Sequence, residues 1–158
     1  MSIDVKMGEV VISRDGECLA TTGVGSCLVI TLYNPKLKFG AMAHAMLARP
    51  DSVVIASEAR QSSALTHDTK YVSDAIDAML TKMQEAGSKN GDLEAKLVGG
   101  ANMFPTFETG VSKNNIEEAK KKLKEKGLRI IGESTGGKIG RSVEFDPKSG
   151  IVTVSIRF

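Results

Sequence analysis

The sequence contains no tryptophan and few other aromatic residues, with 2 tyrosines and 5 phenylalanines in 158 residues. Proteins that stack nucleic-acid bases need exposed aromatic rings, so a stacking surface is not expected. Excess charge is lacking as well, because 21 Lys and Arg residues stand against 19 Asp and Glu residues and leave a net charge of +2. So small a surplus does not indicate a nucleic-acid partner.

Long apolar runs are also missing. No segment approaches the ~20 consecutive apolar residues of a membrane-spanning helix. The first residues, MSIDVKMGEVVIS, carry neither a basic leader nor the apolar core of a secretion signal. We therefore expect a cytoplasmic protein without direct membrane insertion. In that reducing compartment the 2 cysteines, Cys18 and Cys27, are expected to be free thiols.

The size and composition that remain are those of one globular domain, which we predict to span residues 1–158. A 41% apolar and 25% charged chain of this length can bury its own hydrophobic core. Apolar residues alternate or run continuously between glycine and Asn-Pro breaks, a pattern typical of strands. The predicted strands are residues 5–13, 17–22, 27–33, 38–45, 95–98, 129–133, 142–145 and 151–157, with hairpin turns at Asn34-Pro35 and 146–150.

Two segments, 69–86 and 114–126, show the apolar spacing of helices, and each is followed by a glycine suited to a helix C-terminus. Strands outnumber helices, which predicts an α+β fold of packed mixed β-sheets flanked by helices. The segment 47–68 has no apolar period. Its length is unusual in a compact domain and suggests a lid or binding segment. Gln61 lies among small residues of this segment, which suggests the further hypothesis that the loop acts as a pseudosubstrate.

The segment TTGVGSC, which ends at Cys27, is the strongest chemical signal. Two glycines before a cysteine allow a tight backbone turn that aims amide N–H groups at a ligand. A cysteine nucleophile needs such an oxyanion site beside it, and Gly25 and Ser26 are the candidate residues for this site.

His44 is the candidate base for that cysteine, since a thiol with a pKa of about 8.5 needs help at neutral pH. If residues 27–33 and 38–45 pair as a hairpin, Cys27 and His44 lie at the same edge of the sheet. Either Thr21 or Thr22 could orient the imidazole. A lone Cys or His in an apolar strand is more often a packing residue, so the residues alone leave both interpretations open.

Two loops are candidates for contacts with a substrate. The loop that follows the predicted strand 95–98 holds Gly99, Gly100, Asn102 and Phe104. The loop before strand 142–145 holds Thr135, Gly136 and Arg141, which would contact the backbone or acidic side chains of a substrate helix. Ordinary turn and core roles are the alternative for the glycines and for Phe104.

Other site chemistries find less support. The glycines of GVGSC and GGKIGRS resemble phosphate-binding loops, yet no Ser or Thr follows the lysine as such a loop requires. The 2 cysteines and 2 histidines lack the spacing of zinc ligands. No metal and no other cofactor is expected.

Six segments, TTGVGSC, NP, GAMAHAML, LVGGANMF, NNIEEAKKKL and ESTGGKIGRSVEFD, occur in this order over nearly the whole chain. Together they resemble the chemoreceptor glutamine deamidase (CheD) family. The resemblance implies a cysteine hydrolase with Cys27 as nucleophile, His44 as base and Thr21 as orienting hydroxyl. It further implies a fold similar to the deamidase domain of the cytotoxic necrotising factor toxins.

The implied activity is that of a protein-glutamine deamidase in chemotaxis adaptation. Such an enzyme converts selected glutamines of methyl-accepting chemotaxis receptors to glutamate through a thioester and releases ammonia. The same site would also suit hydrolysis of a glutamyl methyl ester. Some members of the family bind a CheC-type phosphatase.

Two alternatives stay open at this point. One is a non-catalytic adaptor that binds a CheC-type phosphatase or receptors, and the other is an amidase for small molecules. A catalytic thiolate at Cys27 predicts faster alkylation by iodoacetamide near neutral pH than at Cys18.

Overall fold

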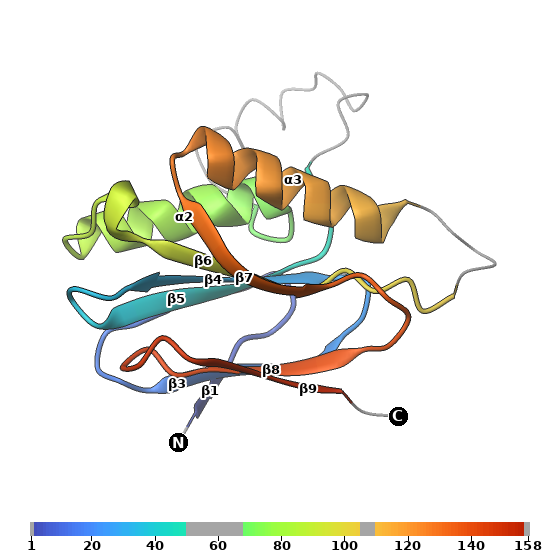
Figure 1. Ribbon diagram of the computed structural model, residues 1–158, viewed down its shortest axis with the longest axis horizontal. Helices are drawn as coiled ribbons and strands as arrows, with labels where there is room; N and C mark the ends of the chain where they lie inside the picture. Colours follow the sequence, from blue (N-terminus) through green and yellow to red (C-terminus); the bar gives the residue numbers. More distant parts are fainter. Residues whose placement is uncertain (1, 50–67, 105–109, 157–158) are drawn as a thin grey trace.

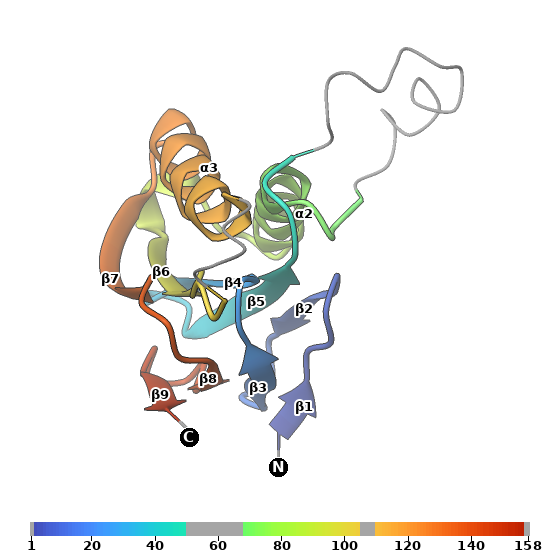
Figure 2. The same cartoon turned by 90° about the vertical axis from the view of Figure 1, so that its right-hand side faces the viewer.

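The computed structural model describes residues 2–49, 68–104 and 110–156. Three layers are stacked in it (Figure 1): helices α2 and α3, a five-stranded sheet below them, and a four-stranded sheet on the far side. Viewed end-on, the helices lie side by side over the larger sheet (Figure 2). This is the predicted α+β architecture with two mixed sheets. Gln61 and most of the predicted loop 47–68 lie outside the described residues.

The elements differ little in place from those that the sequence predicts. The five-stranded sheet has the order β2 (Val10–Ser13), β5 (Phe39–Ala45), β4 (Leu28–Asn34), β6 (Glu94–Gly99) and β7 (Arg129–Thr135). The four-stranded sheet has the order β1 (Ser2–Asp4), β3 (Cys18–Val24), β8 (Arg141–Phe145) and β9 (Val152–Ile156). The helices are α2 (Val72–Glu85) and α3 (Val111–Glu125), with a 3-10 turn η1 (Asn90–Asp92) before β6.

Strand β4 is buried on both faces and separates two apolar cores. Leu28, Ile30 and Leu32 pack toward the helices, whereas Val29 and Tyr33 pack against the four-stranded sheet. A strand covered on both sides needs apolar residues at every position, which explains the continuous run LVITLY.

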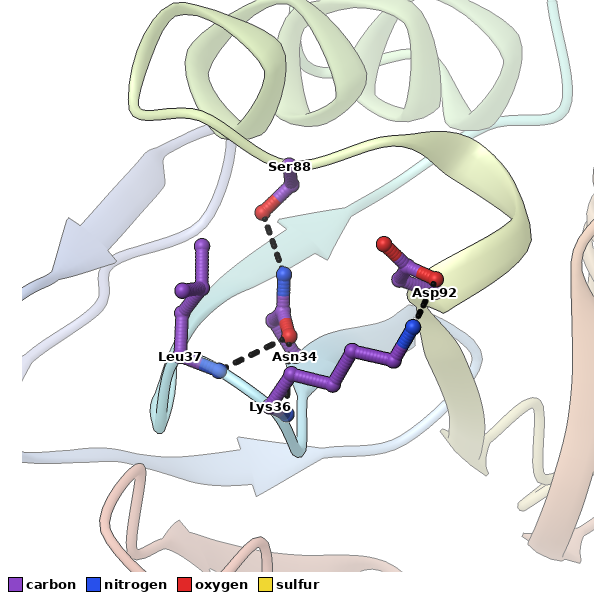
Figure 3. A network of polar contacts seen from close by, with 5 residues as sticks. All are labelled: Asn34, Lys36, Leu37, Ser88 and Asp92. Atoms are coloured by element: carbon purple, nitrogen blue, oxygen red, sulfur yellow. Dashed lines mark hydrogen bonds and ion pairs between the residues drawn. The ribbon is translucent and has the colours of Figure 1, made fainter.

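The predicted hairpin around Asn34-Pro35 is confirmed by antiparallel pairing of β4 with β5. The buried Asn34 side chain fixes its turn (Figure 3), because its Oδ1 accepts the N–H groups of Lys36 at 2.9 Å and Leu37 at 3.0 Å. Its Nδ2 donates to Ser88 Oγ at 2.9 Å, just after α2. Lys36 adds an ion pair of 3.0 Å to Asp92. The turn is thereby tied to the helix layer.

The prediction of one strand over residues 5–13 is wrong. The chain forms β1 in one sheet and β2 in the other, and crosses between the layers through a turn in which Gly8 has a φ of +83°. Apolar alternation continues through this segment, so the sequence pattern does not indicate the interruption between β1 and β2. Two smaller differences concern the helices, since α2 begins after residue 69 and α3 begins before residue 114. None of the helices in the described ranges is both long and apolar enough to cross a membrane.

Candidate active site

Cys27 and His44 are carried by the two strands of the β4–β5 hairpin, at its open end. Val29 pairs with His44 and Leu28 with Ala45, and Cys27 directly precedes β4. The β1–β2 connection touches both strands there. Met7 Sδ lies 3.9 Å from Cys27 Sγ, and the Gly8 N–H donates to the His44 carbonyl at 2.7 Å.

His44 points into the layer between the sheets and is only 1% exposed. Its Nδ1 lies 2.8 Å from the Oγ1 of Thr21, which comes from β3 in the opposite sheet. The other ring nitrogen, Nε2, is buried and has no hydrogen-bond partner within the described part of the chain. Thr22 is exposed, because successive residues of a strand face opposite sides, so the hydroxyl next to the imidazole is that of Thr21.

The surroundings favour uncharged forms of both groups. Burial lowers the pKa of His44, against smaller opposing effects of the Val5 carbonyl and the Asp4 carboxylate. Burial raises the pKa of the Cys27 thiol, and the residue's own backbone N–H opposes this shift. Both shifts favour a neutral thiol and a neutral imidazole in the resting protein. Whether Cys27 is alkylated faster than Cys18 near neutral pH stays a prediction.

The turn that carries Cys27 is held by the loop that follows β6. The N–H groups of Gly100 and Ala101 donate to the carbonyls of Cys27 at 2.8 Å and Gly25 at 2.9 Å. Gly99 approaches so closely that a Cβ would overlap the Cys27 carbonyl and lie 2.7 Å from Val24 Cγ1. Its φ of +117° also belongs to the region that favours glycine. Glycine is thus required at position 99 for packing and for backbone conformation.

The β7–β8 connection is joined to the same loop. The Gly136 N–H donates to the Gly99 carbonyl at 2.9 Å, and the Asn102 N–H donates to the Gly137 carbonyl at 2.8 Å. The Arg141 guanidinium donates to the carbonyls of Gly136 at 2.9 Å and Gly99 at 3.3 Å. Arg141 therefore links the two loops. Its Nη1 and Nη2 groups donate to carbonyls of this chain, whereas the sequence predicted that Arg141 contacts a substrate.

A cleft of about 380 Å³ lies between these loops and the start of α3. Gly100, Asn102 and Gly136 line it, whereas Cys27 and His44 do not. Thr135 ends β7, and its hydroxyl donates to Glu133 at 3.3 Å. Phe104 is 69% exposed, so the interpretation of it as a core residue is wrong. Its contact with a substrate stays a prediction.

Two residues beside the site were not singled out from the sequence. Met7 covers the Cys27 thiol from a connection that the sequence assigned to a strand. Asn115 is fully buried and donates from Nδ2 to the carbonyls of Ser26 and Met46, each at 3.0 Å. Asn115 shares its helix face with Ala119 and Leu123 at four-residue spacing. A polar residue on that apolar stripe is a signal the sequence contained.

A metal centre finds no support in the described ranges, where no three His, Cys, Asp or Glu side chains gather closely enough to hold an ion. The two cysteines are free thiols there.

Comparisons with known proteins identify the family of this chain. A family model described as CheD chemotactic sensory transduction matches residues 50–156. The chemoreceptor glutamine deamidase CheD of Thermotoga maritima is 33% identical over 150 residues, which cover 95% of this chain and 88% of that protein. The probable chemoreceptor glutamine deamidase CheD of Thermococcus kodakarensis is 34% identical over 155 residues, which cover 96% of this chain and 91% of the relative.

A solved structure shares the fold at low sequence identity. The crystal structure of Bacillus licheniformis hypothetical protein YfiH superposes with a TM-score of 0.51 and 13% identity, over 82% of this chain and 51% of that one. This chain thus spans about half the length of that protein, and the likeness concerns the fold alone. The curated relatives extend the similarity through the segments around Cys27 and His44, and with the family match they show that this chain belongs to the CheD family of chemotactic sensory transduction proteins.

Proposed function

We propose that this chain is a protein-glutamine deamidase that acts on methyl-accepting chemotaxis receptors, with Cys27 as nucleophile and His44 as base. The names of its relatives suggest the reaction and the substrate class. One structural observation carries the chemical assignment: Thr21 engages Nδ1 of the buried His44 and leaves Nε2 without a partner in the described residues. In the tautomer whose Nδ1–H donates to Thr21 Oγ1, the lone pair of the neutral imidazole lies on Nε2 and can take a proton.

The first half of the reaction forms a thioester. His44 Nε2 takes the proton of the Cys27 thiol as Sγ attacks the carboxamide carbon of a glutamine. The carbonyl oxygen becomes an oxyanion that backbone N–H groups around Ser26 and Cys27 stabilise. Protonated His44 then gives its proton to the departing nitrogen, the carbon–nitrogen bond breaks, and ammonia leaves.

The second half hydrolyses the thioester. Neutral His44 takes a proton from a water molecule that attacks the acyl carbon. The carbon–sulfur bond then breaks, and His44 returns the proton to the Cys27 sulfur. The product is glutamate. A glutamyl methyl ester would form the same thioester with methanol as the leaving group, so methylesterase activity belongs to the proposal. No step needs a cofactor.

The substrate is proposed to dock on the loops around the cysteine turn. Gly25 and Ser26 lie in that turn, and Gly99, Gly100, Asn102, Thr135 and Gly136 belong to the two loops joined to it. Phe104 and Met103 are exposed beside these loops and offer apolar contacts to a receptor helix or to a CheC-type phosphatase. We further propose that residues 1–158 act as one domain of the fold shared with the cytotoxic necrotising factor deamidases.

The test is mass spectrometry of a receptor cytoplasmic fragment incubated with the protein, read for glutamine-to-glutamate conversion together with ammonia release. We expect Cys27→Ala to abolish both signals, whereas Cys18→Ala keeps them because the proposed mechanism gives Cys18, at the start of β3, no role. Full activity of Cys27→Ala would refute Cys27 as the nucleophile, and the absence of conversion by the wild-type protein would favour the adaptor. Turnover of free glutamine without a receptor would favour the small-molecule amidase.

A further inference from the structure

We propose that Asn115 on α3 is a positioning residue of the oxyanion site: it fixes the peptide between Ser26 and Cys27 so that the Cys27 N–H faces the reacting carbonyl. The inference rests on the proposed function. It assigns a role in the reaction to a helix residue that does not touch the substrate.

The contacts of Asn115 join the two chain segments that carry the reacting groups. One Nδ2 hydrogen goes to the carbonyl of Ser26, directly before the nucleophile, and the other to the carbonyl of Met46, two residues after the base. Both distances are 3.0 Å, and the residue is 0% exposed. A carboxamide is suited to this position because its NH₂ group donates twice.

The contact between Asn115 and the Ser26 carbonyl also determines which way the Cys27 N–H points, because both groups belong to the same peptide. In a trans peptide the C=O and the N–H of one plane point in opposite directions. The Ser26 carbonyl points to Asn115 on the helix layer, so the Cys27 N–H points away from that layer. The pKa of the Cys27 thiol is consistent with this direction, since the residue's own backbone N–H opposes the rise that burial causes. The donor therefore lies on the side of the nucleophile.

Packing alone does not account for an asparagine at this position. Its neighbours on the buried helix face are Ala119 and Leu123, and an apolar residue would continue that stripe. The Asn115 Oδ1 is buried without a hydrogen-bond partner among the described residues, which carries a desolvation cost. The two hydrogen bonds that Nδ2 donates offset this desolvation cost. Both end on backbone carbonyls at the open end of the β4–β5 hairpin.

The test compares Asn115→Ala with the wild-type protein in two assays. In deamidation of a receptor cytoplasmic fragment, we expect kcat to fall roughly 100-fold, the scale of losing one oxyanion donor, with KM unchanged. In alkylation by iodoacetamide, the pH midpoint of Cys27 should move upward, because its thiolate loses a fixed N–H donor. A purely structural role of Asn115 would not move that midpoint upward.

Two variants on the same helix serve as controls. Asn114→Ala removes a neighbouring, exposed carboxamide. Lys122→Ala removes another polar contact of α3, the 2.9 Å ion pair with Asp77 on α2, without touching the cysteine turn. Both variants should keep the wild-type kcat and alkylation midpoint, even where Lys122→Ala lowers the melting temperature.

The wild-type protein offers a second measurement in case Asn115→Ala does not fold. In NMR spectra, the Asn115 side-chain amide protons should exchange slowly with solvent, and the Cys27 amide resonance should titrate together with its thiol. Rapid exchange of the former, or a Cys27 amide that ignores thiol ionisation, would overturn the proposal.

Failure of this inference can be told apart from failure of the proposed function. If Cys27→Ala is inactive while Asn115→Ala keeps the wild-type kcat and midpoint, only the role of Asn115 falls. If Cys27→Ala remains active, the proposed function falls and the role of Asn115 falls with it.

Discussion

His44 and Cys27 illustrate how burial can prepare a reaction without separating charge in the resting protein. Burial withholds water from the charged forms of both groups, the imidazolium and the thiolate. The pKa of His44 is therefore lowered and the pKa of Cys27 is raised, and both shifts favour the neutral forms. In the proposed mechanism, proton transfer from Cys27 to His44 is coupled to attack on the substrate. A hydrogen bond donated by His44 Nδ1 to Thr21 would leave Nε2 available for that proton.

The pH dependence of Cys27 alkylation should reveal this neutral pair. Because burial raises the pKa of the thiol, alkylation by iodoacetamide should keep increasing as the pH rises above neutrality. Because burial lowers the pKa of His44, deamidation should persist until the pH falls below about 6.5, the ordinary value for histidine. A flat alkylation rate from mildly acidic to neutral pH that His44→Gln abolishes would instead indicate a preformed thiolate–imidazolium pair.

Replacement of Thr21 by valine tests the orientation of the base. Thr21→Val keeps the shape of the side chain and removes the 2.8 Å hydrogen bond to His44 Nδ1. We expect kcat to fall roughly 10-fold to 100-fold, a part of the 10²–10⁴ that general base catalysis supplies, with little change in KM. Thr22→Val is the matched control, since that side chain is exposed on the opposite face of β3. Equal losses in the two variants would contradict the role of Thr21.

Among the elements, the loop after β6 determines where the cysteine turn lies. Gly99→Ala should therefore displace that turn, because the new Cβ would overlap the Cys27 carbonyl. We expect a loss of roughly 2–4 kcal/mol in the free energy of unfolding and a large drop in deamidation, measured by thermal denaturation and the receptor assay. Gly127→Ala is the control, since its φ of +78° is also positive but no atom lies within 4 Å of the added Cβ. It should cost only about 1–2 kcal/mol and leave activity intact.

The hairpin that carries the candidate site could be predicted from the sequence, whereas the segment before it could not. The Asn34 side chain forms the turn by accepting hydrogen bonds from the residues that follow it. Such a local turn can be recognised in the sequence from the Asn-Pro pair. The break between β1 and β2 depends on which sheet each half joins, and alternation around Gly8 is the same in either case. Met7 reaches Cys27 only because of that break, so its position could not be anticipated.

The helix boundaries show a similar limit. Helix α3 begins at Val111 after Gly110 in a left-handed conformation, and no side chain caps it. The usual sequence signal for a helix start is therefore missing, and a prediction from apolar spacing begins too late. The same spacing places Asn115 on the buried face. What that side chain bonds is set by contacts distant in sequence, and only the fold brings these together.

For the molecule as a whole, the candidate site depends on how the two sheets pack. Thr21 belongs to the four-stranded sheet and His44 to the five-stranded sheet, so their hydrogen bond spans the inter-sheet core. Phe145 holds this core together. It is fully buried, pairs in register with Leu19 on β3, and meets the Tyr33 ring edge-on at 6.2 Å.

Damage to this core should therefore affect catalysis more than equal damage to the core under the helices. Phe145→Ala is expected to cost about 3–5 kcal/mol, and Met79→Ala about 2–5 kcal/mol, in the free energy of unfolding. Met79 lies on α2, in the core on the other side of the five-stranded sheet. With both variants assayed at a temperature where each is folded, Phe145→Ala should lower kcat roughly 10-fold, because small displacements of reacting groups are costly. Met79→Ala should keep the wild-type kcat. Equal kcat values in the two variants would mean that the site does not depend on the distance between the sheets.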